Sequence, residues 1–178
     1  METGMIVIST LLITLCALPF ILVYGSTKKK EILLKMGLEA LIKKDNGHLT
    51  DYVVSYPFAL GFDRTTKHIY FYKKNQEEVL FQKVKLNEVK ACEVQKEKKH
   101  IKNGKQNNEI VQSVALVFTY TKGNTVEQFK LYDFDDSSQP NGEMDLAVAW
   151  KQKIEVLLSE NVSALVESKT ENRPPELA

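Results

Sequence analysis

The side chains best suited to metal chemistry gather in one short acidic segment in the last third of the chain. They are Asp133, Asp135, Asp136, Asn141 and Glu143. Carboxylate and amide oxygens are ligands that Ca²⁺ and Mg²⁺ prefer. The spacing matches no EF-hand loop, because the glycine and the distal glutamate of that loop are missing. We therefore expect no metal site, and expect these acids to favour the positive N-terminus of a helix that begins near Gly142.

The residues that commonly act as bases or nucleophiles are few and scattered. His48, His68 and His100 fall in separate segments, and the sequence contains no G-x-S-x-G, H-E-x-x-H or phosphate-binding glycine motif. Cys16 lies in an apolar run and Cys92 in an expected strand, so we expect no disulfide and no thiolate metal site. The sequence therefore predicts neither an enzyme nor a bound cofactor.

Lysines dominate the segment from Lys83 to Lys105, which holds eight lysines and His100 against three glutamates. Its section KEKKHIKNGK, Lys96–Lys105, has the character of a loop. Such a loop beside a membrane would contact anionic lipid or an acidic protein, and the alternative is a solvated hairpin loop that lysine keeps soluble. No aromatic residue interleaves it, and the whole chain carries a net charge of only +1, so we expect no nucleic-acid partner.

A charge-free stretch near the N-terminus has the length of a membrane span. Met5–Tyr24 contains 20 residues without a charge, which as a helix would cover about 30 Å, the thickness of the hydrocarbon core. Two alternatives are a buried core helix and a cleaved signal peptide, which would leave an exported β domain. Only Glu2 precedes the stretch, whereas a signal peptide begins with basic residues.

Three lysines follow this stretch and set its expected orientation. Positive charge stays on the cytoplasmic side, so the body of the chain should be cytoplasmic and the protein single-pass. Together with the basic loop, these lysines form the set of candidate contacts to an anionic surface: Lys28, Lys29, Lys30, Lys96, Lys98, Lys99, Lys102 and Lys105.

The elements that would position these groups begin with an amphipathic helix over Lys28–Asp45. Its apolar residues recur at spacings of three and four, and Asn46-Gly47 supplies a C-cap. The apolar stripe comprises Ile32, Leu34, Leu38, Leu41 and Ile42. It packs either on the membrane surface or on the domain that follows.

After Gly47 the sequence changes to short runs rich in β-branched and aromatic residues. Expected strands are Thr50–Tyr56, Phe58–Phe62, His68–Lys73, Val79–Lys83, Val89–Lys96, Val111–Thr121 and Thr125–Tyr132. Polar turns between them indicate consecutive hairpins and hence an antiparallel meander. The aromatic residues of the first strands should fill the core, with the tyrosine hydroxyls at the surface.

Helical spacing returns over Glu143–Ser159, where one apolar stripe includes Trp150 and Ile154. This helix must bury that stripe against the sheet. Residues 161–178 have only a weak apolar run and end in Arg173-Pro174-Pro175-Glu176, which indicates a flexible tail.

Seven strands followed by an amphipathic helix with a tryptophan resemble a pleckstrin-homology-like domain, and in particular its bacterial membrane-anchored forms. The resemblance is carried by GFDRTTKHIYFYKK (Gly61–Lys74), VLFQKVKLNEVKACEV (Val79–Val94) and MDLAVAWKQKIEVLL (Met144–Leu158). It implies a barrel or sandwich of two sheets closed by the helix, and a recognition module. Family members that bind phosphoinositides cluster cations around the first hairpin, and the corresponding loop, Asp63–Lys67, supplies only Arg64 and Lys67.

The sequence thus predicts a mainly β (α+β) protein with four parts: a transmembrane anchor (1–27), a juxtamembrane helix (28–47), a β domain with its C-terminal helix (48–160) and a tail (161–178). The expected function is a membrane-tethered recognition or scaffold domain with a protein or anionic-lipid partner. The rival function is a membrane-bound enzyme or metal-dependent hydrolase that uses the acidic segment.

Overall fold

The computed structural model describes residues 2–75, 78–103, 106–123, 125–136 and 140–171. Within these ranges, the side chains of residues 2–8, 17–27, 101–103, 106–108 and 161–171 lie outside the description. The elements are α1 (Glu2–Lys44), β1 (Asp51–Ser55), β2 (Phe58–Asp63), β3 (His68–Lys74), β4 (Val79–Lys85), η1 (Leu86–Glu88), β5 (Val89–Asn103), β6 (Gln106–Tyr120), β7 (Val126–Asp133) and α2 (Glu143–Glu171).

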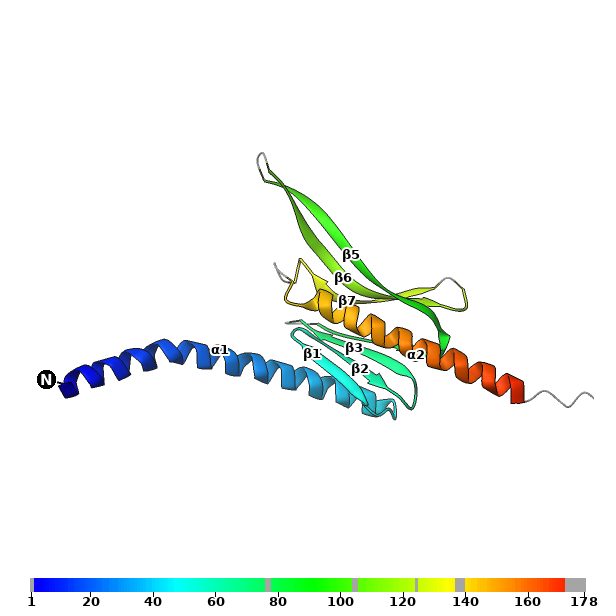
Figure 1. Ribbon diagram of the computed structural model, residues 1–178, viewed down its shortest axis with the longest axis horizontal. Coiled ribbons are helices and arrows are strands. Elements are labelled where there is room, and N and C mark those ends of the chain that lie inside the picture. Colours follow the sequence, from blue (N-terminus) through cyan, green and yellow to red (C-terminus); the bar gives the residue numbers. More distant parts are fainter. Residues whose placement is uncertain (1, 76–77, 104–105, 124, 137–139, 172–178) are drawn as a thin grey trace, which may run out of the picture.

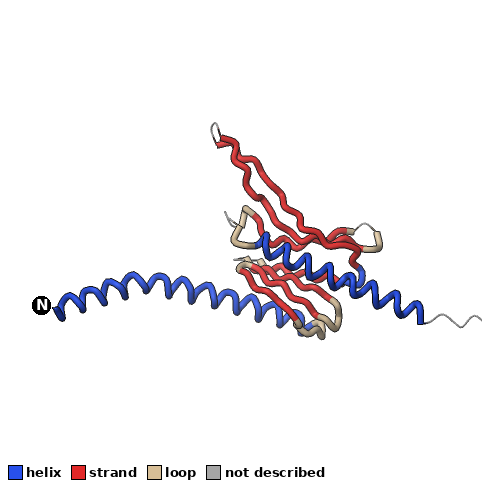
Figure 2. The backbone as a smooth tube through the Cα atoms, in the orientation of Figure 1, coloured by secondary structure: helices blue, strands red, loops and turns tan. Residues whose placement is uncertain are grey.

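Two antiparallel sheets form the body of the protein (Figures 1 and 2). The first has the order β1-β2-β3-β4 and the second the order β5-β6-β7. Strands that follow one another in the sequence pair as hairpins within each sheet, as the polar turns between apolar runs predict. The predicted mainly β architecture with seven strands and a C-terminal helix is confirmed.

The main core lies between the two sheets and α2. Phe71 of the first sheet stacks on Phe129 of the second with ring centroids 5.2 Å apart, and Phe118 meets Phe129 at 4.8 Å. Ala147, Trp150 and Ile154 of α2 close this core. Aromatic pairs at these separations contribute about 0.5–1.5 kcal/mol beyond the burial of their area.

The strands β2 and β3 are covered on both faces. Phe58, Leu60 and Phe71 point into the main core, whereas Ala59, Tyr70 and Tyr72 point to the opposite face, where they form a second cluster with α1. This second cluster corrects the expectation that the tyrosine hydroxyls lie at the surface for Tyr70 and Tyr72, whereas Tyr52 and Tyr56 are 45% and 44% exposed. Tyr70 is only 1% exposed, because a helix covers the face that alternation alone would leave to solvent.

α1 is one helix from Glu2 to Lys44, and its C-terminal part packs on the first sheet. Leu34, Leu38 and Ile42 are buried there, so this part of the expected stripe packs on the domain, whereas Ile32 is 57% exposed. The helix ends as predicted at Asn46-Gly47. Asn46 adopts a φ of 56°, and the Gly47 N–H donates to the Ile42 carbonyl at 3.0 Å, the hydrogen bond of a Schellman cap.

The N-terminal half of α1 exposes apolar side chains where they are described. Leu11, Leu12, Ile13 and Leu15 are each more than half exposed. Among the residues that the structure describes, no helix is both long and apolar enough to cross a membrane. Much of the predicted span Met5–Tyr24 lies outside that description, because the side chains of residues 5–8 and 17–24 are not included.

Two elements extend beyond their expected ends. α2 continues to Glu171, so residues 161–171 are helical where a flexible tail was expected; neither glycine nor proline interrupts the sequence before Pro174. Residues 172–178 lie outside the described residues. The strand β5 reaches Asn103, so most of the expected loop Lys96–Lys105 is paired with β6.

Candidate functional site

A cleft of about 640 Å³ opens at one end of the body, where the two sheets diverge. The turns after β1 and β3 and the segment after β7 surround it. Its lining residues are Tyr56, Pro57, Lys73, Asn75, Glu78, Leu131, Tyr132, Asp133, Asp135, Asp136, Asn141 and Glu143. All five of the oxygen-bearing residues expected from the sequence to lie together line this cleft, where Lys73 and Asn75 from a distant segment join them.

The position of this cleft relative to α1 follows from contacts at the two ends of the first sheet. At the cleft end, Lys30 Nζ lies 4.6 Å from the centroid of the Tyr56 ring. At the other end, Lys83 Nζ donates to Asp45 Oδ2 at 2.6 Å. The cleft end of the body is thus the end that faces back along α1 toward its N-terminal half.

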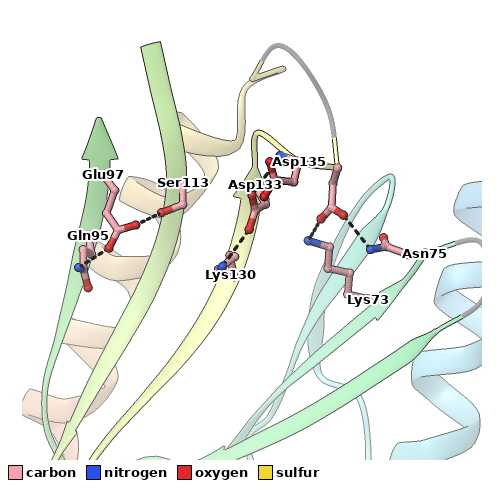
Figure 3. A network of polar contacts seen from close by, with 9 residues as sticks. Lys73, Asn75, Gln95, Glu97, Ser113, Lys130, Asp133 and Asp135 are labelled. Carbon is pink, nitrogen blue, oxygen red and sulfur yellow. Dashed lines mark hydrogen bonds and ion pairs between the residues drawn. The ribbon is translucent and has the colours of Figure 1, made fainter. Parts of the chain in front are cut away.

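Asp136 connects the two sides of the cleft. Lys73 Nζ of β3 donates to Asp136 Oδ2 at 2.6 Å, and Asn75 Nδ2 donates to Asp136 Oδ1 at 2.9 Å (Figure 3). The Lys73 side chain is only 8% exposed. Because a buried ammonium is costly without a partner, this ion pair fixes the segment after β7 against the first sheet.

Asp133 is held in a similar way at the end of β7. Lys130 Nζ donates to its Oδ2 at 2.8 Å and the Asp135 N–H donates to its Oδ1 at 3.1 Å (Figure 3). Burial opposes ionisation of Asp133, but these two hydrogen bonds outweigh it and lower the pKa of the carboxyl group. Glu143, at the start of α2, accepts a hydrogen bond from the Asn141 N–H.

Protein donors thus occupy carboxylate oxygens of the acidic segment. Among the described residues, no group of three or more His, Cys, Asp or Glu side chains is placed to hold a metal ion. The arrangement ties the segment after β7 to β3, which is a structural task. Sequence reasoning did not identify Lys73 and Asn75 as part of this site, because they precede Asp136 by about 60 residues and only the fold joins them.

A two-stranded arm continues beyond the cleft. The last pair between β6 and β7 is Ser113 with Asp133, whereas β5 and β6 continue for six more pairs, from Lys98↔Val111 to Asn103↔Gln106. We call residues 98–103 and 106–111 the β5–β6 arm. At about 3.4 Å per residue it extends roughly 20 Å past the end of β7.

The base of this arm is anchored by a carboxylate on its surface. Glu97 accepts hydrogen bonds from Ser113 Oγ at 2.9 Å and from Gln95 Nε2 at 3.2 Å (Figure 3). A register shift between Glu97 and Lys98 marks where the arm leaves the three-stranded sheet. Such a bulge increases the local twist of a strand. Figure 1 shows the arm rising from the side of the body away from α1 and slanting toward the end from which the N-terminal half of α1 projects.

The candidate lysines fall into two groups on different elements. Lys28, Lys29 and Lys30 lie on α1, and Lys96, Lys98 and Lys99 are exposed at the base of the arm. Lys98 pairs with Glu109 at 3.1 Å. The side chains of Lys102 and Lys105 lie outside the described residues. The two groups do not form one patch, but both lie on the side of the body that carries the cleft.

The loop expected to correspond to the ligand loop of pleckstrin-homology domains has a different place and role. The first hairpin turns at Tyr56-Pro57, whereas Asp63–Lys67 joins β2 to β3 at the opposite end. Asp63 is fully buried and accepts hydrogen bonds from the N–H groups of His48, Thr65 and Thr66 at 2.8–3.2 Å. The acid at this position therefore shapes a turn.

The histidines and cysteines lie on different elements, although His48 and His68 both neighbour Asp63. His48 precedes β1, His68 begins β3 and His100 lies on the arm. Cys16 is exposed on α1 and Cys92 is buried in the main core. Burial, with the nearby Glu155 carboxylate, raises the pKa of Cys92 to about 12, so this thiol stays protonated at neutral pH.

Comparison of the chain with protein-family models, with curated proteins and with solved structures yields no match.

Proposed function

We propose that this protein is a membrane-tethered recognition domain, in which the N-terminal half of α1 crosses the bilayer and the β domain stands at the cytoplasmic surface. The observation that carries the proposal is the continuity of α1. One helix runs from the charge-free sequence Met5–Tyr24 into the apolar interface of Leu34, Leu38 and Ile42 with the first sheet. The domain thus packs directly on the helix, and within the described helix no flexible linker separates this interface from the charge-free segment.

The charge pattern supports the orientation. Lys28, Lys29 and Lys30 follow the charge-free segment directly, where cations retain a helix end in the cytoplasm. Lys30 lies six residues after Tyr24, so the Tyr56 ring that it contacts stands about 9 Å along the helix axis from the end of that segment. The headgroup layer is about 5–8 Å thick on each side. The cleft end of the domain therefore faces the lipid headgroups.

The recognition role rests on the two antiparallel sheets and the closing helix α2, an arrangement similar to a pleckstrin-homology-like domain. We assign the chain to that fold as part of the proposal. The hydrolase alternative is not favoured, because the acidic residues that it would use are engaged by Lys73, Asn75 and Lys130. The proposed partners are proteins and lipids at the inner face of the membrane, held at high local concentration by the tether.

The proposal is tested by membrane extraction and topology mapping of the full chain. The wild-type protein should resist carbonate extraction, and a reporter fused to its C-terminus should report a cytoplasmic location. The double variant Leu12→Arg/Leu15→Arg should become extractable, because each arginine costs about 2.5–3.5 kcal/mol near the centre of a span. Both positions are exposed and far from the β domain, so the fold should persist.

The matched control is Leu12→Ile/Leu15→Ile, which should extract like the wild type. Complete extraction of the wild-type chain by carbonate, or a reporter located outside the cell, would overturn the proposal. A mature product that lacks its first residues on N-terminal sequencing would support export after signal cleavage instead.

A further inference from the structure

We propose that the β5–β6 arm is a second point of contact with the membrane and that it binds anionic lipid headgroups. This inference rests on the proposed membrane anchor and adds a partner to it. It depends on three observations: where the arm begins, which way it extends, and which charges it carries.

The arm begins at the end of the domain that faces the bilayer. Its base is the pair Ser113 with Asp133, and Asp133 lines the cleft whose other wall includes Tyr56. The Tyr56 ring lies against Lys30, close to the charge-free segment of α1. A roughly 20 Å extension from this end, slanted as in Figure 1, brings the arm back toward the level of the first residues after that segment.

A third strand does not accompany the arm, since β7 ends at Asp133. An isolated two-stranded hairpin is only marginally stable in water, so a surface that covers one of its faces would stabilise it. Its described residues also include an apolar side chain: Ile110 is half-buried on β6, whereas its neighbour Val111 packs against the main core. Lys99 pairs with Ile110, so the face of the arm that carries them combines a cation with an apolar group.

The charge of the arm and its base favours anionic lipid over other surfaces. The sequence from Lys96 to Glu109 holds five lysines against two glutamates. Lys98 is paired with Glu109, and Lys96 and Lys99 are exposed on β5. A lysine near an anionic leaflet increases binding about fivefold, and the gain is lost beyond a Debye length of about 8 Å. These cations can therefore attract anionic lipid only because the slant of the arm brings them close to the membrane surface.

The test uses the full chain reconstituted in vesicles of phosphatidylcholine alone or with phosphatidylglycerol. In a Cys16→Ser background, an environment-sensitive fluorophore is attached at His100→Cys on the arm or at Asn87→Cys at the opposite end of the domain. Both positions are exposed. Lipids with a quencher at the headgroup should quench the His100→Cys probe in the anionic vesicles and leave the Asn87→Cys probe unchanged.

The lysine dependence provides a matched comparison. Lys96→Gln/Lys99→Gln should lower the contact equilibrium of the His100→Cys probe about 25-fold, that is, about fivefold per lysine. Lys90→Gln/Lys122→Gln removes the same charge at the far end and should have no such effect. Raising the salt concentration should weaken the wild-type signal, as for any exposed electrostatic contact.

The outcomes separate the arm from the anchor. A chain that floats with the vesicles but whose His100→Cys probe is not quenched overturns the arm contact and leaves the anchor intact. Equal quenching of both probes would contradict the proposed orientation of the domain, with its cleft end toward the bilayer, and would overturn this inference. A chain that fails to float with the vesicles overturns the membrane anchor and the arm contact together.

Discussion

The interface between α1 and the first sheet makes a quantitative prediction for Leu38. Its side chain is completely buried between the helix and the sheet, whereas Leu33, five residues earlier on another face of the helix, is 61% exposed. Leu38→Ala should lower the free energy of unfolding by about 2–5 kcal/mol, because it removes buried methyl groups and leaves a cavity. Leu33→Ala should change the free energy of unfolding by no more than about 0.5 kcal/mol.

The cost of Leu38→Ala should fall in the upper part of that range, because the surrounding groups have little freedom to fill the space. Gly61 opposite has no side chain, and the nearest atom of Leu38 would lie only 3.0 Å from a Cβ built there. Tyr72 is fixed by its own contact with Gly37. The loss of unfolding free energy is largest where the surrounding groups cannot move in to fill the cavity.

The assay is urea unfolding of the detergent-solubilised full chain, followed by the fluorescence of Trp150, the single tryptophan. Trp150 lies in the main core and away from α1. The fluorescence of Trp150 should still report the lost stability. The strands β2 and β3 contribute to the main core with one face and to the α1 cluster with the other, so the two clusters should unfold together. The urea midpoint should fall while the slope of the transition stays the same.

The reasoning is refuted if Leu38→Ala and Leu33→Ala unfold within about 0.5 kcal/mol of each other. That result would mean that α1 is not coupled to the sheet. A 2 kcal/mol difference corresponds to about a 30-fold change in the unfolding equilibrium, well above the uncertainty of such a measurement.

Three further predictions concern the body of the domain. Gly61→Ala should destabilise it by about 1–3 kcal/mol in the same urea assay, since a Cβ there would lie 2.5 Å from Leu49; unchanged stability would contradict the close packing. Burial opposes ionisation of Asp63, but N–H donors including that of His48 outweigh it and lower its pKa. Its contribution is therefore present above pH 4 and lost as the pH falls through the folded-state pKa, so Asp63→Asn should be less stable at pH 7 and lose less stability on acidification. Iodoacetamide at pH 8 should modify Cys92 slowly in the folded protein and rapidly in urea, because its folded-state pKa is about 12; equal rates by mass spectrometry would argue against its burial.

Much of the fold follows from local patterns. The alternation of apolar residues predicts where β2 and β3 lie to within about one residue, and Asn46-Gly47 predicts the end of α1 through a known cap geometry. These signals are local, since a few neighbouring side chains decide them. They do not indicate which sheet face a distant helix will cover, and so they predict core packing of Tyr70 and Tyr72 but not the burial of their hydroxyl ends under α1.

The arm and the cleft depend on information that local patterns lack. Lys96–Asn103 is rich in charge and shows little alternation, so it reads as a loop although backbone pairing with β6 makes it a strand. The contact of Lys73 with Asp136 joins residues 63 positions apart. Predicting it requires the register of both sheets, which the sequence of either segment does not determine.

The burial of β2 and β3 on both faces also has a consequence for biosynthesis. α1 is translated before any strand, and its buried stripe is fully covered only once β3 is complete at Lys74, 30 residues after α1 ends. At about 5–20 residues per second, this leaves the stripe uncovered for roughly 2–6 seconds. During that interval the nascent chain presents Leu34, Leu38 and Ile42 to the ribosome exit region and its chaperones. The step that shields them is the arrival of β3, so a translational pause placed before Lys74 would lengthen this vulnerable period.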